Sequence, residues 1–522
     1  MKNNEGQVMF PPPGKTPRED TLAVMKFYEL PEKFPAAVLK EAKSVVKLLE
    51  KPGKRLDLRK QFIFTCDPET ARDYDDALSL GKDRRGNMVL GVHIADVSHF
   101  VRPGSAIDRE AARRSTSVYF ADRVLPMLPD ELCNGVCSLV PNEDRLAFSV
   151  FMTFDKSGKM IARSFAKSII RSKARFTYEQ VMRVISTKGK MKDKSVSAVA
   201  KRTILAVNSL AARLRASRFA AGALDIEIPE AEVILDKFGE MSGIVTRPYD
   251  ESHQMVEECM VAANEAVATE LWTKGVKILA RLHEPPDEEK LLMLRADMRS
   301  LGVKMGNISN QKVFAQFLKT IKQNPLYPTL STMVLRSMKR ALYDPEKIGH
   351  FGLAKRFYAH FTSPIRRYPD LTLHRQLAKY LEGGNARVPA KTLSKWAEHS
   401  SEREEKAAEA ERALLEIKKF RLLESQLNSG RVIVYDGVIS KCAPFGCFVE
   451  IPEIAASGLV HVSHLSNKFV RFSEDDHSLS ATGGLRWKIG DAIKVRVSNV
   501  DFRQRRIDFI PVGMRERRGW RR

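Results

Sequence analysis

The chain has 522 residues, too many for one ordinary hydrophobic core, so we expect two or three domains. Its 87 Lys and Arg outnumber its 64 Asp and Glu, and the net charge of +23 favours nucleic acid, although ribosomal, histone-like and membrane-surface proteins are equally basic. The six cysteines form no CxxC pair, so we expect no zinc site and no disulfide-linked partner. No apolar run is long enough to span a membrane, so we expect no membrane anchor and a cytoplasmic protein.

Residues 1–54 are expected to form an N-terminal extension that is partly flexible. The first stretch, to about position 20, is polar and contains a proline triplet at 11–13, which resists packing. The spacing of apolar residues between positions 35 and 49 then predicts an amphipathic helix. Its expected role is to pack on the segments that follow.

A small antiparallel sheet is predicted next. Its strands are three short apolar runs at 61–65, 77–80 and 88–94, the last two flanking the turn-like KDRRGN segment. Asp67 leaves the first strand and Asp96 leaves the third. Asp75 and Asp76 enter the second strand. We therefore expect these carboxylates to gather at one rim of the sheet.

The rest of the chain changes from helices to strands. Positions 178–381 are mostly helical in pattern, with long alanine- and leucine-rich stretches at 199–216 and 255–271. Positions 396–427 predict one long charged helix with a solvated face. Five short alternating strands between 430 and 511 then predict a closed barrel of OB type. The fold class is α+β: a mixed domain with a small antiparallel sheet rim and many helices, followed by an all-β OB-fold barrel.

The sharpest chemical signal is the segment FTCDPETARDYDDALSL. It places Asp67, Asp73, Asp75 and Asp76 within ten residues, and such a cluster repels itself unless a cation lies in it. Magnesium prefers oxygen ligands and is commonly held by one or two carboxylates together with substrate phosphates, and manganese suits the same ligands. A metal held in this way can polarise a phosphodiester and activate a water. The segment therefore predicts a site that hydrolyses phosphodiesters.

Two other interpretations of the aspartate cluster stay open on spacing alone. A calcium-binding loop of EF-hand type would need a different ligand spacing and a central glycine, which the segment lacks. An acidic surface turn without a metal is the other alternative.

The same segment resembles the signature of the RNase II/RNase R family, the RNB-type exoribonucleases. Further family-like segments follow in the family's order: GVHIADVSHFV at 91–101, TSVYFADRVLPMLP at 116–129, ARFTYEQV at 174–181, VEECMVAANEA at 256–266 and GHFGLAKRFYAHFTSPIRRYPDLTLHR at 349–375. The resemblance covers about 55–510, and the last segment most resembles the RNase R branch. It implies a magnesium-dependent 3′-to-5′ exoribonuclease that degrades RNA processively to nucleoside 5′-monophosphates.

The resemblance also implies a domain plan. We expect an RNB-type catalytic domain at 55–428, an OB-fold RNA-binding domain at 429–511 of the kind repeated in the largest small-subunit ribosomal protein, and a basic tail at 512–522. RNase R relatives carry cold-shock barrels before the catalytic domain. Only about 55 residues precede the motif here, so we expect this chain to lack them. The implied partner is single-stranded RNA with a free 3′ end, bound by a monomer.

Residue by residue, the resemblance assigns metal binding to Asp67, Asp73, Asp75 and Asp76, with Asp75 the most critical for catalysis. Arg366 and Arg367 follow in HFTSPIRRYPD, and a guanidinium can bind a phosphate bidentately and offset charge that develops in the transition state. The resemblance favours Arg366 at the scissile phosphate and Arg367 as an RNA contact. For either arginine, a surface ion pair with Asp370 is the alternative.

Three more residues match family positions that handle RNA. Tyr119 corresponds to an aromatic that stacks on a base, which suits any RNA sequence. Its partner aromatic should lie in GALDIEIPEAE, where this chain has Ile226, so we expect a one-sided clamp and leave the final product length open. Tyr178 and Glu258 match positions for sugar recognition and 3′-end placement. The alternative for Glu258 is a buried helix carboxylate paired with an arginine.

The barrel contains Phe445, Phe448 and His461, with Lys441, Lys468 and Arg471 interleaved. Aromatic side chains beside cations on an OB face are typical of single-strand binding. Alternation along the strand leaves open that Phe448 belongs to the core. His93 and His99, with Asp96 between them, resemble a metal constellation in isolation, but we expect His93 to be structural.

Two other functions compete with that of an exoribonuclease. An RNA-binding protein with an inactive centre would be free to lose the four aspartates and Arg366, yet all of them are present. An endonuclease or a DNase would not require a free 3′ end of RNA.

Overall fold

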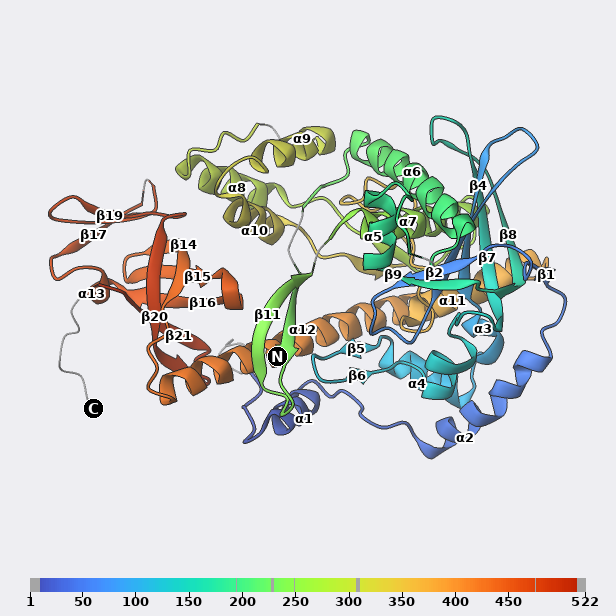
Figure 1. Ribbon diagram of the computed structural model, residues 1–522, viewed down its shortest axis with the longest axis horizontal. Helices are drawn as coiled ribbons and strands as arrows, with labels where there is room; N and C mark the ends of the chain where they lie inside the picture. Colours follow the sequence, from blue (N-terminus) through green and yellow to red (C-terminus); the bar gives the residue numbers. More distant parts are fainter. Residues whose placement is uncertain are drawn as a thin grey trace.

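The computed structural model describes residues 10–193, 195–226, 230–247, 249–306, 310–474 and 476–513. Helices and strands form a large mixed body that ends in an all-β barrel, and the long helix α12 (Ala390–Asn428) connects the two (Figure 1). The predicted α+β class is therefore confirmed. No described helix is long and apolar enough to cross a membrane.

The body is built on one seven-stranded sheet, in the order β1-β8-β7-β4-β3-β2-β9. Its strands are β1 (Leu56–Asp57), β2 (Phe64–Asp67), β3 (Asp76–Lys82), β4 (Met88–Ala95), β7 (Asp144–Phe154), β8 (Met160–Arg171) and β9 (Ala174–Thr177). The three expected strands are β2, β3 and β4, but the sheet is larger than expected, and β1 and β9 join it by parallel pairing. Most of β7 is buried along both faces, so its sequence lacks the alternation that reveals a half-buried strand.

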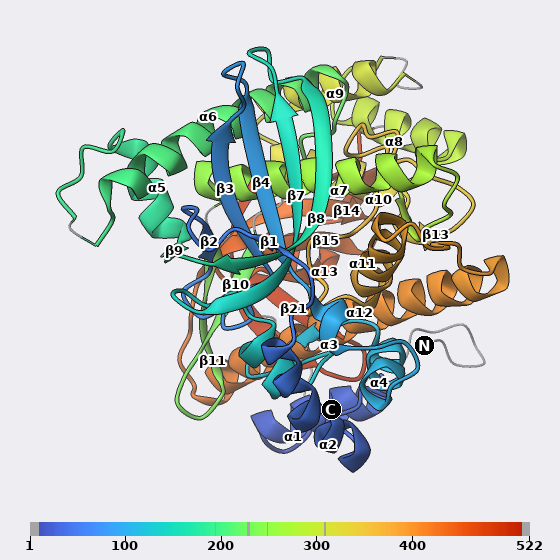
Figure 2. The same ribbon diagram turned by 90° about the vertical axis from the view of Figure 1, so that its right-hand side faces the viewer.

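Helices cover both faces of this sheet. On one face lie α5 (Tyr178–Ser186), α6 (Ala198–Ala220) and α7 (Glu251–Thr273), which share a core with β2, β3, β4 and β7 (Figure 2). On the other lie α2 (Ala36–Val45), α3 (Val97–Phe100), α4 (Ala106–Arg114) and the π-helical η2 (Glu131–Val136). The predicted long helices correspond to α6, α7 and α12. The predicted helix at 35–49 is α2 followed by the 3-10 helix η1 (Val46–Glu50).

The remaining elements of the body surround this core. They are α1 (Pro17–Phe27), β5 (Val118–Tyr119), β6 (Val124–Leu125), β10 (Glu230–Leu235), β11 (Met241–Arg247), β12 (Ala280–Leu282), α8 (Glu288–Ser300), α9 (Gln311–Ile321), α10 (Tyr327–Ser337), β13 (Leu342–Asp344) and α11 (Tyr368–Leu381). Helices α8, α9 and α10 form a separate small core. Hairpin β5–β6 shares another core with α1 and α12.

The N-terminal extension is more ordered than expected. Helix α1 begins at Pro17, where Thr16 caps it, and its buried Asp20 forms an ion pair with Arg421 of α12. Val24 is also fully buried between α12 and the β5–β6 hairpin. The expectation of a lead-in that resists packing to about position 20 is therefore corrected for α1. Residues 1–9 and most of the basic tail, from position 514, lie outside the described residues.

The five predicted barrel strands are confirmed. They are β14 (Tyr435–Ala443), β15 (Gly446–Ile451), β16 (Ala456–His461), β20 (Ala492–Asp501) and β21 (Arg506–Pro511), closed in the order β14-β15-β16-β21-β20. Around them lie η3 (Pro452–Ile454), α13 (Val462–Leu465) and a small sheet of β17 (Val470–Ser473), β18 (Ser478–Ala481) and β19 (Leu485–Trp487).

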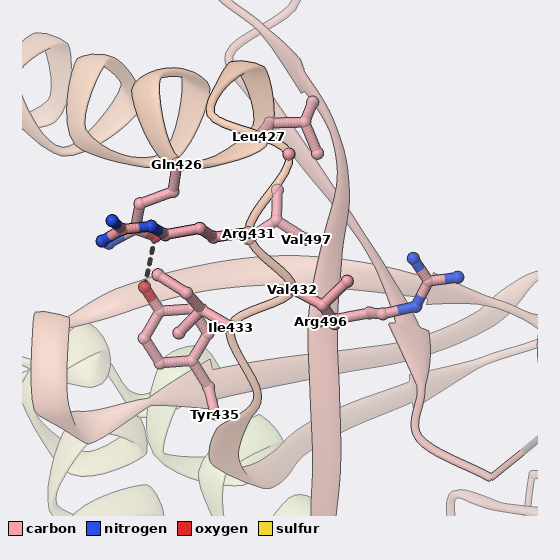
Figure 3. Close-up of a pocket in the computed structure, with 9 residues that line it drawn as sticks. Gln426, Leu427, Arg431, Val432, Ile433, Tyr435, Arg496 and Val497 are labelled. Carbon is pink, nitrogen blue, oxygen red and sulfur yellow. Dashed lines mark hydrogen bonds between the residues drawn. The ribbon is translucent and has the colours of Figure 1, made fainter.

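The barrel is docked on the end of α12. Phe420 and Leu423 of this helix belong to the barrel core. A cavity of about 220 Å³ opens at the junction, where the Tyr435 hydroxyl donates a hydrogen bond to Gln426 (Figure 3). None of the predicted site residues lines this cavity. The junction therefore holds the two parts of the protein together.

Candidate active site

The sheet brings the aspartates of the FTCDPETARDYDDALSL segment to one edge. Asp67 is the last residue of β2 and Asp76 is the first of β3, with Asp73 and Asp75 in the loop between them. Because β2 and β3 are antiparallel, the end of one strand lies at the same edge as the start of the next. The Asp75 carbonyl also accepts a hydrogen bond from Ala95, at the end of β4. The predicted rim therefore exists.

Asp75 is the most enclosed of these carboxylates, with 4% of its surface exposed. Its Oδ1 accepts a 2.9 Å hydrogen bond from the backbone N–H of Ile365. Its Oδ2 is buried without a hydrogen-bond partner, and so is Oδ2 of Asp67. Burying a charged oxygen without a donor is costly, so these two atoms require something positive close to them.

The pKa values of these aspartates indicate the same need for a nearby positive charge. Burial raises the pKa of Asp75 well above its ordinary range, and the nearby Arg366 only partly opposes this. Burial also raises the pKa of Asp67 and of Asp76, and the Asp76 charge raises that of Asp67 further. Three carboxyl groups therefore resist ionisation together. A bound divalent cation would remove this resistance.

The donor set fits a hard cation that is only partly enclosed by protein. All four predicted ligands offer carboxylate oxygens, and two of those oxygens have no other partner. Within the described part of the chain, no group of three or more His, Cys, Asp or Glu side chains is arranged so that it could hold a metal ion by itself. Magnesium commonly uses one or two carboxylates and completes its shell with water and substrate phosphates. The carboxylate oxygens therefore suit a hard cation that a phosphate helps to hold, and magnesium at this rim stays a prediction.

Asp96 is not part of this carboxylate set. It lies at the end of β4, as expected, but its buried carboxylate pairs with Arg55 at 2.7 Å and accepts a hydrogen bond from Ser98. This corrects the expectation that Asp96 joins the rim aspartates. His93 is fully buried, with hydrogen bonds to Ser79 and Ser149. This is the structural role expected for His93.

The two neighbouring arginines lie in different surroundings. The Arg366 side chain is 44% exposed, and its Nε lies 3.8 Å from Oδ2 of Asp75, too far for a hydrogen bond. The Arg367 side chain is only 19% exposed and binds the buried Asp370 through Nε at 2.9 Å and Nη2 at 2.8 Å. The ion pair with Asp370 therefore forms at Arg367, although it is largely buried rather than on the surface. An RNA contact of Arg367 stays a prediction. Arg366 is the arginine that faces the aspartates.

Tyr119 lies at the opening of the same site. Its hydroxyl is 3.5 Å from Oδ2 of Asp73, and the residue is 42% exposed. Its backbone N–H donates a 2.7 Å hydrogen bond to Glu411 of α12. The strand that carries it is linked to the arginine loop, because Ser117 donates to the carbonyl of Arg366. A ring in this position is available to stack on a base beside the carboxylates.

Ile226 does not lie free at the rim. Its side chain packs against the core formed by α8, α9 and α10. The expectation of a one-sided clamp, with Ile226 where the family has the partner aromatic of Tyr119, stays a prediction.

Tyr178 lies beside Asp67 through strand pairing. In the parallel β2–β9 pair, Asp67 is the register partner of Thr177, and Tyr178 follows as the first residue of α5. Its ring stacks on the ring of His253, with centroids 3.9 Å apart and planes 15° apart. This places His253 at the site, although the sequence offered no signal for it.

Glu258 forms a buried ion pair with an arginine, which was the alternative to an RNA contact. It is buried on α7, and both of its carboxylate oxygens lie 3.1 Å from Nε of Arg218. It also lines a cavity of about 550 Å³ between α6, α7 and the β7–β8 hairpin. A contact between Glu258 and RNA would have to compete with this ion pair, and its RNA-binding role stays a prediction.

The barrel gathers its predicted RNA contacts on one surface. Phe445, in the β14–β15 turn, is 49% exposed, and its ring meets the ring of the half-buried Phe448 at 6.0 Å and 86°. The exposed His461 is the register partner of Gly446, next to Phe445. Neither phenylalanine belongs to the barrel core, within the residues described. The three rings offer an aromatic surface to solvent.

Comparison with known proteins places the chain in a family. The model of the RNB domain matches residues 55–383, and that of the S1 RNA binding domain matches 433–510. The chain belongs to the RNB family. Two curated relatives are Ribonuclease R of Thermotoga maritima, 39% identical over 96% of this chain and 74% of the relative, and Ribonuclease R of Aquifex aeolicus, 38% identical over 94% and 70%.

A solved structure agrees with this assignment. RNase R of Mycoplasma genitalium in complex with ribose methylated single-stranded RNA superimposes with a TM-score of 0.85, at 28% identity, over 95% of this chain and 78% of that one. The chain therefore lies in the RNase R branch of the RNB family. It is a hydrolytic 3′-to-5′ exoribonuclease of RNA degradation with an S1-type barrel.

Proposed function

We propose that this RNB exoribonuclease uses magnesium to remove nucleoside 5′-monophosphates processively from single-stranded RNA with a free 3′ end, acting as a monomer. The observation that carries the proposal is the pair of buried carboxylate oxygens, one on Asp67 and one on Asp75, that lack a hydrogen-bond donor. They lie at a rim that also holds an exposed arginine, Arg366. A phosphate and a hard cation together would satisfy all of these groups.

Asp67, Asp73, Asp75 and Asp76 are the residues that would hold the metal, and manganese should substitute for magnesium. When bound, the metal would act as a Lewis acid on the scissile phosphate and would lower the pKa of a water that it binds. The Ile365 N–H fixes Asp75, so its second oxygen is oriented before substrate arrives. Such preorganisation lowers the cost of reaching the transition state.

Arg366 is proposed to bind the phosphate at the bond that breaks. Its guanidinium can offer two parallel N–H donors to non-bridging oxygens and offset the charge that develops on them. Ser363 Oγ accepts a 3.1 Å hydrogen bond from Nη2 of Arg366, which orients the group. Arg367 contributes indirectly: its ion pair with Asp370 holds the loop that carries Arg366.

Tyr119 is proposed to stack on a base near the carboxylates, and Tyr178 to contact the sugar at the 3′ end. The aromatic surface of Phe445, Phe448 and His461 would hold the strand further from the site. Contacts outside the centre keep RNA bound between successive cleavages, which is the physical basis for processive action. The Mycoplasma relative has also been solved with double-stranded RNA, which makes duplex entry worth testing.

The test uses 5′-labelled RNA that is single-stranded, 3′-overhanging or blunt, together with a circular RNA and a DNA of the same sequence. Each is incubated with magnesium, with manganese or with a chelator. We expect stepwise shortening from the 3′ end and release of 5′-monophosphates only when metal is present. Cleavage of the circle or of DNA would instead indicate an endonuclease or a DNase. Binding without cleavage would indicate an RNA-binding protein.

A further inference from the structure

A stack of two rings lies next to the rim. The Tyr178 and His253 rings are nearly parallel, with centroids 3.9 Å apart, although they belong to different helices and are 75 positions apart in the chain. Tyr178 begins α5, and His253 lies in the first turn of α7. Stacking over the full ring face restricts the rotation of both side chains.

The His253 ring is itself fixed by the start of its helix. Its Nδ1 lies 2.9 Å from Oδ1 of Asp250, the N-cap residue of α7. The same carboxylate oxygen accepts a 3.0 Å hydrogen bond from the backbone N–H of Ser252. A carboxylate held in this way assigns the proton on Nδ1 and leaves the ring little freedom to turn. The imidazole is therefore a rigid surface.

On the other side, Tyr178 lies beside the edge that carries the aspartates, because Thr177, the residue before it, is the register partner of Asp67. Burial raises the pKa of the Tyr178 hydroxyl, and Cys66, Asp76 and Asp67 raise it further. The backbone at Tyr178 is fixed by the capping box of Thr177 and Gln180. The remaining freedom is rotation of the side chain. His253 removes that freedom.

We propose that His253 is a positioning residue, which holds the Tyr178 phenol at the place where the sugar of the 3′-terminal nucleotide lies. This inference rests on the proposed function. In this proposal, Asp250 orients His253 and His253 orients Tyr178. The enzyme then discriminates a 3′-terminal ribonucleotide from a 2′-deoxynucleotide. His253 acts through the tyrosine and does not itself touch the reacting phosphate.

The experiment is a double-mutant cycle on the full chain with metal present. His253→Ala, Tyr178→Ala and the double variant are compared on two short RNAs, one ending in a ribonucleotide and one in a 2′-deoxynucleotide. The readout is the ratio of single-turnover kcat/KM on the two RNAs. We expect His253→Ala to lower this ratio by about three- to tenfold, the size of one aromatic stacking contact. Adding His253→Ala to Tyr178→Ala should lower it no further.

Two more variants separate positioning from a general loss of structure. His253→Phe keeps a flat ring and should retain the ratio within about threefold, whereas Asp250→Asn should give a smaller loss than His253→Ala. His99→Ala is the matched control, because His99 also contacts an aromatic ring, Phe100, but lies on the far face of the sheet. It should leave the ratio unchanged.

Additive effects of the two alanine substitutions would overturn the proposal, as would a ratio that His253→Ala leaves at the wild-type value. Failure of His253→Phe to retain the ratio would also overturn it, since a flat ring would then not be what matters. A wild-type enzyme without metal-dependent release of monophosphates would refute the proposed function instead. The two failures are therefore distinguishable.

Discussion

In the proposed function, the rim of the sheet and the surface of the barrel bind the same RNA by opposite physical means. At the rim, carboxylate oxygens are buried and two of them have no donor, which costs free energy that a bound cation would offset. On the barrel, Phe445 and His461 are exposed, and exposure of a ring costs little. We therefore expect hydrolysis to depend on buried carboxylates, whose charged form is costly, and RNA affinity to depend on exposed rings, whose exposure costs little.

Helix α12 joins the two regions. Its Glu411 accepts a hydrogen bond from the backbone of Tyr119, and its Phe420 lies in the barrel core. Deleting residues 430–522 would therefore expose the end of α12 as well as remove RNA contacts. Single substitutions on the barrel surface test the division of labour more cleanly than truncation does.

The largest expected effect belongs to the rim. Asp75→Asn removes one ligand charge but keeps the shape of the side chain, so we expect hydrolysis to fall by at least about 100-fold. RNA affinity should stay the same or rise, because a negative charge is lost where phosphate binds. Single-turnover hydrolysis and equilibrium binding of labelled RNA measure the two quantities. Turnover within tenfold of wild type would contradict the role of Asp75.

The rim could be predicted because its aspartates are close in sequence. The five barrel strands and the long helices α6, α7 and α12 also follow from local periodicity. The sequence did not reveal interactions between residues that lie far apart in the chain. The Arg55 that neutralises Asp96 and the Glu411 that holds Tyr119 could not be identified by any local pattern.

The two adjacent arginines show that even neighbouring residues cannot always be assigned from the sequence. Arg366 and Arg367 are identical in type, and only their directions from the chain decide which one faces the aspartates. The stack of His253 on Tyr178 depends on how α5 and α7 meet, which no spacing within either helix determines. Tertiary packing, rather than composition, creates these contacts.

The second prediction separates those two arginines. Arg366→Ala should slow single-turnover hydrolysis by about 100-fold, since it removes one charge-stabilising group, and should leave the melting temperature nearly unchanged. Arg367→Ala should instead destabilise the fold by roughly 3 to 5 kcal/mol, because it leaves the buried Asp370 without its cationic partner. Kinetics and thermal unfolding of both variants provide the comparison. Equal effects of the two on stability would argue against the assignment.

The third prediction concerns the barrel. Phe445→Ala should weaken binding of long single-stranded RNA by roughly 1 to 3 kcal/mol while hydrolysis of bound RNA proceeds at the wild-type rate. Phe445→Tyr keeps the ring face and is the matched control. If single-turnover cleavage fell as much as affinity, the barrel would belong to the catalytic apparatus.

The fourth prediction uses the cost of the metal-free rim. A carboxyl group whose pKa is raised by folding binds its proton more tightly in the folded state, so stability is lost as pH rises from the ordinary value of 3.8 through the raised values of Asp67, Asp75 and Asp76. With a chelator, the melting temperature should therefore fall by a few degrees between pH 5 and about pH 9. Magnesium should reduce the fall, and so should Asp75→Asn. If the melting temperature fell equally steeply with pH in all three samples, the buried carboxylates of the rim would not be the cause of the fall.

The smallest expected effect on rate is at Tyr119, between the two regions. Tyr119→Ala removes a stacking contact of about 1 to 3 kcal/mol per base but leaves the carboxylates in place, so degradation should continue and the final fragment should change in length. A high-resolution gel of end products measures this, and an unchanged ladder would show that the stack lies elsewhere.

Ile226→Phe is a less direct test of the clamp than the sequence position of Ile226 indicates, because Ile226 packs against the core of α8, α9 and α10. A larger ring there should lower the melting temperature by overpacking before it adds a second stacking surface. If Ile226→Phe instead retained shorter fragments without loss of stability, the clamp would be two-sided in this fold and the packed position of Ile226 would be one of two arrangements.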